Sequence, residues 1–193
     1  MELIFATNNQ NKVKEIRNVI GDKITILPLK EAGIIIEIPE PYDTLQDNAQ
    51  EKAQTIYHLT GKNCFSEDSG LEVSVLNGAP GVKSARFAGE KATDQQNIQL
   101  LLSFLKDKEN REAQFRTVIA LIWEQQTYYF EGICKGRITR EISGEGGFGY
   151  DPIFIPEGSN KTFAEMNMEE KNGFSHRKKA TTQLIAFLKE RLG

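Results

Sequence analysis

Two adjacent carboxylates interrupt an apolar segment in the stretch Phe65-Ser66-Glu67-Asp68-Ser69-Gly70-Leu71. Residues 63–65 lead into it, and residues 71–75 leave it with the apolar and polar alternation of a strand. Because successive strand side chains point to opposite faces, Glu67 and Asp68 are not both expected to point into a core, and at least one should face a cleft or solvent. Two acids, a hydroxyl and a glycine at a strand end suit a magnesium site or a general base. The same residues favour a hairpin turn, which is the better interpretation of the stretch taken alone.

The chain before this stretch begins with a strand, a polar loop and a helix. Residues 3–6 form an apolar run that predicts a buried strand, and a helix follows with Val13, Ile16 and Ile20 on one face. The polar loop between them consists of Thr7, Asn8, Asn9, Gln10, Asn11 and Lys12. Backbone N–H groups and the dipole at a helix start favour an anion there, and the lysine adds a full charge. An ordinary helix entry rich in capping residues is an equally good interpretation.

Further strands and helices are predicted on either side of the acidic stretch. Residues 24–28 predict a second strand, and residues 33–38 predict an edge strand or a loop because two prolines follow them. Residues 45–60 have the apolar spacing of a helix, with Asp47 on another face. Residues 77–81 read Asn-Gly-Ala-Pro-Gly, which is a strong turn signal.

The second half of the chain begins with a helix and continues with adjacent strands. Thr93 and Gln96 match a capping box before an amphipathic helix, whose apolar positions are Ile98, Leu101, Leu102 and Leu105. Three neighbouring runs then predict strands, at residues 115–123, 127–134 and 137–142. Because no helix separates them, we expect antiparallel pairing, unlike the strand and helix alternation of the first half.

A glycine-rich segment follows at residues 144–152, which read Gly-Glu-Gly-Gly-Phe-Gly-Tyr-Asp-Pro. It contains the letters G-x-G-x-x-G, but that fingerprint requires a helix to start within it, and here Pro152 and a strand-like run follow. The match is therefore interpreted as coincidental. Phe148 and Tyr150 still offer aromatic faces beside Asp151, which favours a planar ligand over a simple strained turn.

The chain ends in a helix whose first turn carries two potential cations. Residues 161–168 predict a short helix and residues 169–173 a turn, after which Ser175 is expected to cap the last helix. The apolar positions of that helix are Ala180, Leu184, Phe187 and Leu188. Cations in a first helical turn are unfavourable for the helix dipole, so His176 and Arg177 suggest an anionic partner. Two exposed polar residues are the alternative interpretation.

Composition and charge limit the classes of function. The 193 residues suit one large domain or two lobes that share a core. The net charge of -3 and the absence of a basic block argue against a nucleic-acid partner, and the apolar runs are too short to span a membrane. The two cysteines are far apart and have no paired metal-ligand spacing, so neither zinc nor a disulfide framework is expected. With no signal peptide in view, we expect a cytoplasmic protein.

The motifs are weak one by one, but their order and identity together resemble the inosine triphosphate pyrophosphatase family, also called the Ham1 or RdgB family. The resemblance covers nearly the whole chain, from Phe5 to the last helix. It rests on Thr7, Asn9 and Lys12; on Asp47-Asn48-Ala49 with Lys52-Ala53; on Glu67-Asp68-Ser69-Gly70-Leu71; on Gly78-Ala79-Pro80-Gly81 with Ser84-Ala85-Arg86; on the run from Gly146 to Pro152; and on Lys171 followed by Ser175-His176-Arg177.

This resemblance implies a fold and an activity. The fold would be α/β, a single ITPase-like domain over residues 1–193 with an elongated mixed β-sheet flanked by helices, two lobes and a central cleft. The enzyme would use magnesium to hydrolyse ITP, dITP and XTP to the monophosphate and pyrophosphate, and it would form a homodimer.

The resemblance also implies roles for individual residues. Asp68 would be catalytic, and Asp68, Asp47 and Glu67 would hold the metal ion. Substrate would be bound by Thr7, Asn8, Asn9, Gln10, Asn11, Lys12 and Ser69 at the phosphates, and by Phe148, Gly149, Tyr150, Asp151, Lys171, His176 and Arg177 at the base. The family often has glutamate at the position of Asp47, so this shorter side chain is expected to reach the metal directly or through a water molecule.

Three alternatives are open at this stage. A dinucleotide-dependent oxidoreductase would need a helix directly after Gly149, which Pro152 argues against. A nucleotide-binding protein without turnover would keep the pocket while its altered acidic residues fail to support catalysis. A Maf-type pyrophosphatase would have a similar fold and other substrates, but the Ser-His-Arg motif favours the inosine group.

Overall fold

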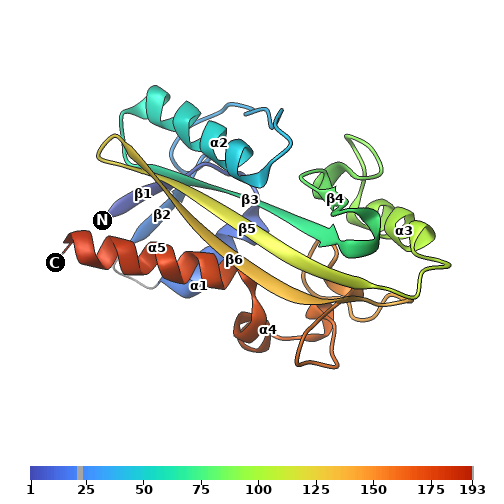
Figure 1. Cartoon of the computed structure of the whole chain (residues 1–193). Coiled ribbons are helices and arrows are strands. Elements are labelled where there is room, and N and C mark those ends of the chain that lie inside the picture. The colour runs from blue at the N-terminus through green and yellow to red at the C-terminus, as the bar shows by residue number, and fades with distance from the viewer. Residues whose placement is uncertain (21–23, 193) are drawn as a thin grey trace. The chain divides into compact units, whose positions relative to one another are not determined.

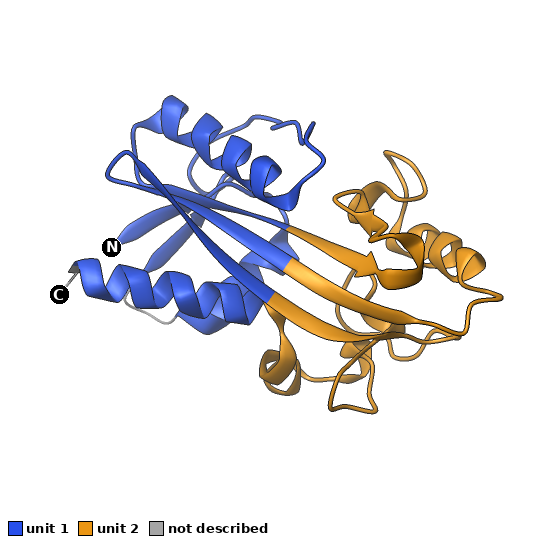
Figure 2. Ribbon diagram, in the orientation of Figure 1, with its two compact units in different colours: residues 1–68, 117–132, 177–193 blue, residues 69–116, 133–176 orange. Residues whose placement is uncertain are grey.

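The chain forms two compact units, and each of three long strands contains residues of both. In this computed structural model, which describes residues 1–20 and 24–192, unit 1 comprises Met1–Asp68, Thr117–Gly132 and Arg177–Gly193, and unit 2 comprises Ser69–Arg116 and Ile133–His176 (Figure 2). The strands β3 (Cys64–Val73), β5 (Glu112–Trp123) and β6 (Gln126–Ile138), which are labelled in Figure 1, contribute residues to both units, as the two colours of Figure 2 show. The acidic pair Glu67-Asp68 is therefore the last part of β3 that belongs to unit 1.

Unit 1 is a sheet with helices on both faces. Strands β1 (Glu2–Phe5) and β2 (Thr25–Pro28) are parallel, β1 is also parallel to β3, and the order is β2-β1-β3-β5-β6. The helices are α1 (Gln10–Ile20), α2 (Leu45–Thr60) and α5 (His176–Leu192).

Strand alternation distributes the core of unit 1 between these two faces. Leu3 and Phe5 pack in one apolar cluster with residues of α1 and α5, whereas Ile4 and Ala6 pack in another with residues of α2. Strand β5 continues the same alternation, with Ile119 and Leu121 in the first cluster and Ala120 and Ile122 in the second.

Unit 2 has a smaller sheet and more irregular backbone. Strand β4 (Pro80–Gly81) is antiparallel to β3, and β7 (Phe154–Pro156) is antiparallel to β6, so the order is β4-β3-β5-β6-β7. Helices α3 (Asp94–Phe104) and α4 (Met168–Phe174) complete it, together with short 3₁₀ turns at Ser74–Leu76, Ser84–Arg86, Asp151–Ile153 and Phe163–Glu165. Its core is one apolar cluster that includes Leu71, Leu101, Phe115 and Phe154.

The predicted α/β class is confirmed, with a mixed sheet flanked by helices. The predicted helix at residues 45–60 agrees with α2 at both ends, and the predicted capping box of Thr93 and Gln96 is present at α3. Residues 33–38 are a loop, one of the two predicted outcomes.

No α-helix follows Gly149, because a 3₁₀ turn and β7 come next, which confirms that the G-x-G-x-x-G match is coincidental. Among the described residues, no helix is both long and apolar enough to cross a membrane.

The hairpin interpretation of the acidic stretch is wrong. Strand β3 runs without interruption from Cys64 to Val73, so Glu67 and Asp68 lie in mid-strand. Both carboxylates are also buried, contrary to the expectation that at least one would face a cleft or solvent. The reason is that alternation decides which face a side chain points to, whereas burial depends on what covers each face, and here cationic side chains pair with both acids.

Three other predictions in the second half are wrong. Of the separate strand predicted at residues 137–142, only residues 137 and 138 are extended, and they are the end of β6 because Gly136, Arg137 and Ile138 pair with β7. Residues 139–142 are not in a strand. The turn predicted at residues 169–173 lies inside α4, whose start is fixed by a capping box between Asn167 and Glu170. The predicted helix at 161–168 is reduced to the 3₁₀ turn Phe163–Glu165.

Gly70 generates a test of how tightly β3 packs beyond the acidic pair. A Cβ atom at this position would lie 2.4 Å from the carbonyl oxygen of Gly81 in β4. Gly70→Ala is therefore expected to force the two strands apart and to lower the free energy of unfolding by about 1–3 kcal/mol. Urea denaturation would measure this, with Gly173→Ala as the control because a Cβ there has no atom within 4 Å. Equal midpoints for the two variants would contradict this account of the strand contact.

Candidate functional site

Strand β3 holds two adjacent carboxylates at its centre, and both are almost completely buried. Glu67 is 2% exposed and Asp68 is 6% exposed. Burying an ionised carboxylate is unfavourable unless cations or hydrogen-bond donors compensate. In unit 1 these cations come from three helices, since Lys12 lies in α1, Lys52 in α2 and Arg177 in α5.

Glu67 is held by two of these cations. Its Oε1 lies 3.1 Å from Lys12 Nζ, and its Oε2 accepts a hydrogen bond of 2.7 Å from Arg177 Nε. Arg177 also pairs through its second guanidinium nitrogen with Glu15 of α1, and both side chains are buried. Burial opposes ionisation of Glu67, but the charges of Arg177 and Lys12 outweigh it and hold the pKa of Glu67 well below its usual range. Glu67 is therefore an ionised acceptor at neutral pH.

Asp68 has a different environment, because one of its oxygens is paired and the other is not. Lys52 Nζ lies 3.3 Å from Asp68 Oδ1, donates a hydrogen bond of 2.9 Å to the carbonyl oxygen of Glu67, and also pairs with Glu40. Asp68 Oδ2 is buried and has no hydrogen-bond partner among the described residues. Burial raises the pKa of Asp68, although Lys52 and Lys12 act in the opposite direction.

This unpartnered oxygen is the unusual feature of the site. Buried polar atoms in proteins almost always have a partner, so an exception calls for a functional explanation. An oxygen with a free lone pair, next to carboxylates, can accept a proton, a water molecule or a hard cation such as magnesium. Within residues 1–20 and 24–192, no group of three or more His, Cys, Asp or Glu side chains is arranged to hold a metal ion.

Asp47, the third predicted metal ligand, is an exposed residue in the first turn of α2. Its carboxylate accepts a hydrogen bond of 2.6 Å from the hydroxyl of Thr44, and its backbone N–H donates to that hydroxyl over 3.1 Å. These contacts cap the helix. Its role toward a metal stays a prediction.

The polar loop at residues 7–12 leads into α1, and its contacts are those of a helix cap, while its binding of an anion stays a prediction. Asn9 Oδ1 accepts hydrogen bonds from the backbone N–H groups of Asn11 and Lys12, and the N–H of Asn9 donates to Thr7 Oγ1. The capping interpretation is therefore confirmed. Asn8 and Gln10 are exposed beside these contacts, and the Lys12 ammonium reaches Glu67. The loop is thus tied to the acidic pair through the lysine, which the capping interpretation alone does not explain.

The predicted base-contacting residues of unit 2 centre on Asp151. Its Oδ2 lies 2.7 Å from Lys171 Nζ and accepts a hydrogen bond of 3.0 Å from the backbone N–H of Phe148. The same ammonium lies 5.2 Å from the centre of the Phe148 ring and 5.4 Å from that of Phe163. The chain thus brings an acid, a cation and an aromatic ring together, as the sequence suggested.

The other predicted residues of unit 2 have structural contacts of their own. Tyr150 is buried, and its hydroxyl donates a hydrogen bond of 2.8 Å to the carbonyl oxygen of Ser84. His176 is buried and stacks on Phe115, with ring centres 4.8 Å apart. Gly149 donates its N–H to Asp94, and Ser69 is a half-buried residue of β3 directly after Asp68.

Several site residues were not identified from the sequence. Glu15 was missed, although it directly precedes Ile16 on a helix whose apolar face was recognised. Glu40 was missed because it lies between two prolines in a loop, where no periodicity exists to interpret. The view of His176 and Arg177 as exposed is wrong, since both are buried. The anionic partners that Arg177 suggested include Glu67 and Glu15 of the same unit.

Comparison with known proteins identifies relatives along almost the whole chain. Residues 3–187 match the family model described as the Ham1 family. A protein of Flavobacterium psychrophilum named dITP/XTP pyrophosphatase is 50% identical over 189 residues, which cover 98% of this chain and 100% of the relative. A protein of the same name from Porphyromonas gingivalis is 50% identical over 188 residues, which cover 97% of each chain.

Solved structures agree with this relationship. The Ham1 protein of Staphylococcus aureus is 38% identical and superposes with a TM-score of 0.90, with coverage of 99% of this chain and 100% of that one. A structure from Mycobacterium abscessus described as a nucleoside-triphosphatase or dITP/XTP pyrophosphatase is 40% identical, with a TM-score of 0.78 and coverage of 95% and 98%.

The cations around Glu67 generate a prediction about acid stability. Because the folded-state pKa of Glu67 is lowered, its contribution to stability is complete above the unfolded-state pKa of about 4.3 and is lost as the pH falls below it. Glu67→Gln is expected to lower the free energy of unfolding at pH 7 by about 3 kcal/mol, since Arg177 and Lys12 lose a buried partner. The difference from wild type should shrink as the pH falls below about 4.

Urea denaturation at pH 7, 5 and 3.5 would measure this difference, with Glu37→Gln as the matched control because Glu37 is exposed in the same unit. A deficit for Glu67→Gln that stays constant with pH would mean that the carboxylate is not ionised in the folded protein.

Proposed function

The chain belongs to the Ham1 family, and from this premise we propose that it is a nucleoside triphosphate pyrophosphohydrolase that converts ITP, dITP and XTP to the monophosphate and pyrophosphate. Such an enzyme removes deaminated purine nucleotides from the nucleotide pool. The observation that carries the proposal is the buried, unpartnered Oδ2 of Asp68 beside an ionised glutamate and two lysines. This arrangement offers an acceptor for water or metal together with cations for phosphate.

Asp68 is proposed as the catalytic carboxylate. Its raised pKa and free oxygen suit a group that accepts a proton from, or orients, a water molecule that attacks the α-phosphorus. Lys52 bonds to the other oxygen and thereby fixes the direction of the free one. Glu67 stays ionised between Lys12 and Arg177. It supplies a second negatively charged carboxylate beside the proposed position of the attacking water molecule.

Magnesium is the proposed cofactor, and the residues present fit it. Asp68 offers an unpartnered oxygen, and Glu67 and Glu40 provide further carboxylates in the same unit that are now paired with lysine. Magnesium prefers oxygen ligands and keeps several water molecules, so a few protein carboxylates and the substrate phosphates suffice. When bound, the ion neutralises phosphate charge and lowers the pKa of water. Asp47 is proposed to act through such a water molecule.

The triphosphate is proposed to bind at the start of α1. Residues Thr7 to Lys12 combine exposed polar groups with the positive end of the helix dipole, and the Lys12 ammonium is already directed to the acidic pair. Ser69 adds a hydroxyl one residue after Asp68. Because phosphoryl chemistry depends on positioning and charge stabilisation, these groups contribute to catalysis as well as to binding.

The base is proposed to contact the residues around Asp151. A 6-oxo purine needs hydrogen-bond donors, whereas the 6-amino group of adenine needs acceptors. Lys171, His176 and Arg177 carry donors, and Phe148 offers an aromatic ring for stacking beside Gly149 and Tyr150. A base that leaves buried site groups unpaired is strongly disfavoured, and this is the basis of the proposed preference for ITP over ATP.

The remaining proposals concern organisation. We propose that residues 1–193 act as a single ITPase-like domain, in line with one family match over residues 3–187, and that two copies form a homodimer. Light scattering of the purified protein distinguishes a dimer from a monomer. We further propose that the protein acts in the cytoplasm, which agrees with two buried free cysteines in the described part of the chain.

Asp68→Asn is the variant that tests the proposed function. We expect release of pyrophosphate from ITP and XTP by the wild type, with little release from ATP or GTP, and a loss of about 10²-fold or more in kcat for Asp68→Asn because a neutral amide cannot accept the proton or bind the cation. A coupled phosphate assay with added inorganic pyrophosphatase measures both. Asp43→Asn, an exposed aspartate of unit 1, is the matched control.

Three outcomes would overturn parts of the proposal. Full activity of Asp68→Asn would exclude the aspartate as the catalytic group, and ITP binding without turnover by the wild type would indicate a binding protein. Chelation of magnesium by EDTA should stop formation of the nucleoside monophosphate, and added magnesium should restore it. Chromatography of the nucleotides measures this, because the coupling pyrophosphatase itself needs magnesium. Unchanged activity in EDTA would remove the cofactor from the proposal while leaving the substrate class in place.

A further inference from the structure

The glycine-rich segment at residues 146–151 is held in place by a helix that the proposed function does not use. The backbone N–H of Gly149 donates a hydrogen bond of 2.7 Å to Asp94 Oδ2, across 55 positions of the sequence. Asp94 is the first residue of α3 and, like the segment, belongs to unit 2. This is a hydrogen bond to a charged acceptor, which is stronger than one between neutral groups.

Asp94 is not needed to cap its own helix. That role belongs to Thr93, whose hydroxyl accepts a hydrogen bond from the N–H of Gln96, while the Gln96 side chain accepts one from the N–H of Thr93. The capping box is complete without Asp94. The carboxylate of Asp94 is therefore available for the bond to Gly149.

A second polar residue of α3 acts in the same direction three positions later. Asn97 is buried, accepts a hydrogen bond of 2.8 Å from the N–H of Ala88, and donates one of 3.1 Å to the carbonyl oxygen of Ala85. Residues three apart lie on the same side of a helix. One side of α3 thus holds both the glycine-rich segment and the segment 84–88.

These two segments are also bonded to each other and to β3. The Tyr150 hydroxyl donates to the carbonyl oxygen of Ser84, and Ser84 Oγ accepts a hydrogen bond of 2.9 Å from the N–H of Leu71. A continuous set of hydrogen bonds therefore runs from β3 through Ser84 to Tyr150, which directly follows Gly149. Asp94 fixes the exposed end of this set, and its charge adds to burial in raising the pKa of Tyr150.

The segment itself leaves little room for Asp151 to move. A Cβ at Gly147, whose φ is +75°, would lie 2.1 Å from Asp151 Oδ2, the oxygen that binds Lys171 and the N–H of Phe148. A displacement of Gly149 therefore reaches Phe148 and Asp151 through the backbone on either side of it.

We propose that Asp94 is a positioning residue for recognition of the base. By holding the Gly149 N–H, it fixes Phe148 and Asp151. This role rests on the proposed function of these two residues as base contacts. The carboxylate itself touches no substrate. Its removal should loosen the segment, weaken binding of the correct nucleotide and leave the groups around Asp68 unaffected.

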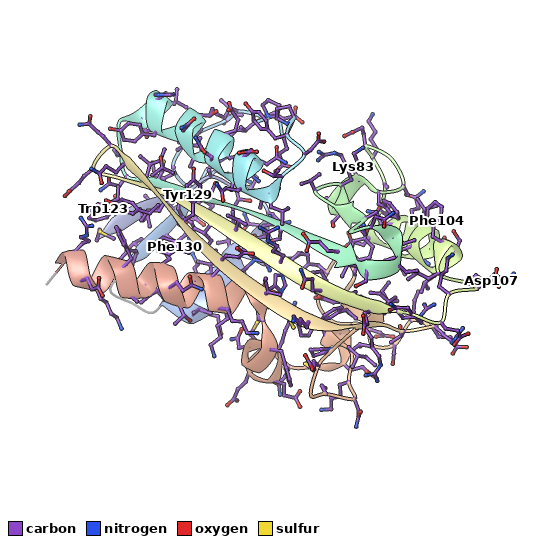
Figure 3. The ribbon with its side chains drawn as sticks, viewed as in Figure 1. Lys83, Phe104, Asp107, Trp123, Tyr129 and Phe130 are labelled. Carbon is purple, nitrogen blue, oxygen red and sulfur yellow. The ribbon has the colours of Figure 1, made fainter. Side chains whose placement is uncertain are left out.

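The test compares Asp94→Ala and Asp94→Asn with Asp107→Ala. Asp107 is an exposed aspartate in the turn after the opposite end of α3, so it matches Asp94 in charge and exposure without belonging to the helix (Figure 3). Asp94→Ala should raise KM for ITP about five- to tenfold with kcat within about twofold, and should reduce the ratio of kcat/KM for ITP over GTP. Asp94→Asn keeps an acceptor oxygen and should restore part of the loss, while Asp107→Ala should behave as wild type.

Hydrogen exchange of the backbone amides at residues 147–151 provides a readout that does not depend on turnover. Faster exchange in Asp94→Ala, with residues 13–20 of α1 unchanged, supports the proposal. Unchanged exchange at 147–151 overturns it, whether or not the protein hydrolyses ITP. Faster exchange combined with unaltered KM and selectivity in an active enzyme also overturns it, because the segment would then be held for stability alone. If the wild type hydrolyses neither ITP nor XTP and exchange is faster in Asp94→Ala, the proposed function and the recognition role of Asp94 are both overturned. Only the structural hydrogen bond between Asp94 and Gly149 is then left.

Discussion

Burial of two adjacent ionisable carboxylates in the middle of β3 is the constraint on which the rest of unit 1 depends. A carboxylate removed from water requires a cation or a set of donors, and a strand cannot provide either from its own backbone without losing its ladder. The chain meets this requirement with Lys12, Lys52 and Arg177, one from each helix of the unit. The three helices are therefore held at the same point of the sheet. Their apolar side chains pack in the clusters on its two faces.

The two carboxylates end up in different states because their partners differ. Glu67 has a cation on each oxygen, which lowers its pKa, whereas Asp68 has a lysine on one oxygen and, within the described part of the chain, no partner on the other. Such a division between neighbouring acids is typical of sites in which one group holds charge and the other reacts.

Close approach of backbone segments has the corresponding role in unit 2. Gly147 makes room for the Asp151 carboxylate, and Gly70 makes room for the carbonyl of Gly81. The hydroxyl of Tyr150 as donor, and Ser84 Oγ and the Asp94 carboxylate as acceptors, then form hydrogen bonds that hold irregular segments with no ladder of their own. Glycines allow these segments to come close, and the polar side chains determine where they stay.

The sequence by itself determined several of the helices and strands, the family and many of the candidate residues. Helix α2 and the capping box of α3 follow from local periodicity and local hydrogen bonds, which short segments encode on their own. The spacing and order of the Glu-Asp-Ser-Gly, glycine-rich and Ser-His-Arg motifs indicated the family. The match of residues 3–187 to the family model confirms it.

Only the tertiary structure decided how those residues interact. Glu15 and Glu40 come close to Arg177 and Lys52 through packing of helices and a loop, and no local pattern signals such a contact. The acids of β3 looked like a turn because the propensities of Asp, Ser and Gly are local, whereas their burial depends on cations up to 110 residues away. Pairing with β7 likewise extended β6 beyond the predicted break, since strand length depends on the neighbouring strand.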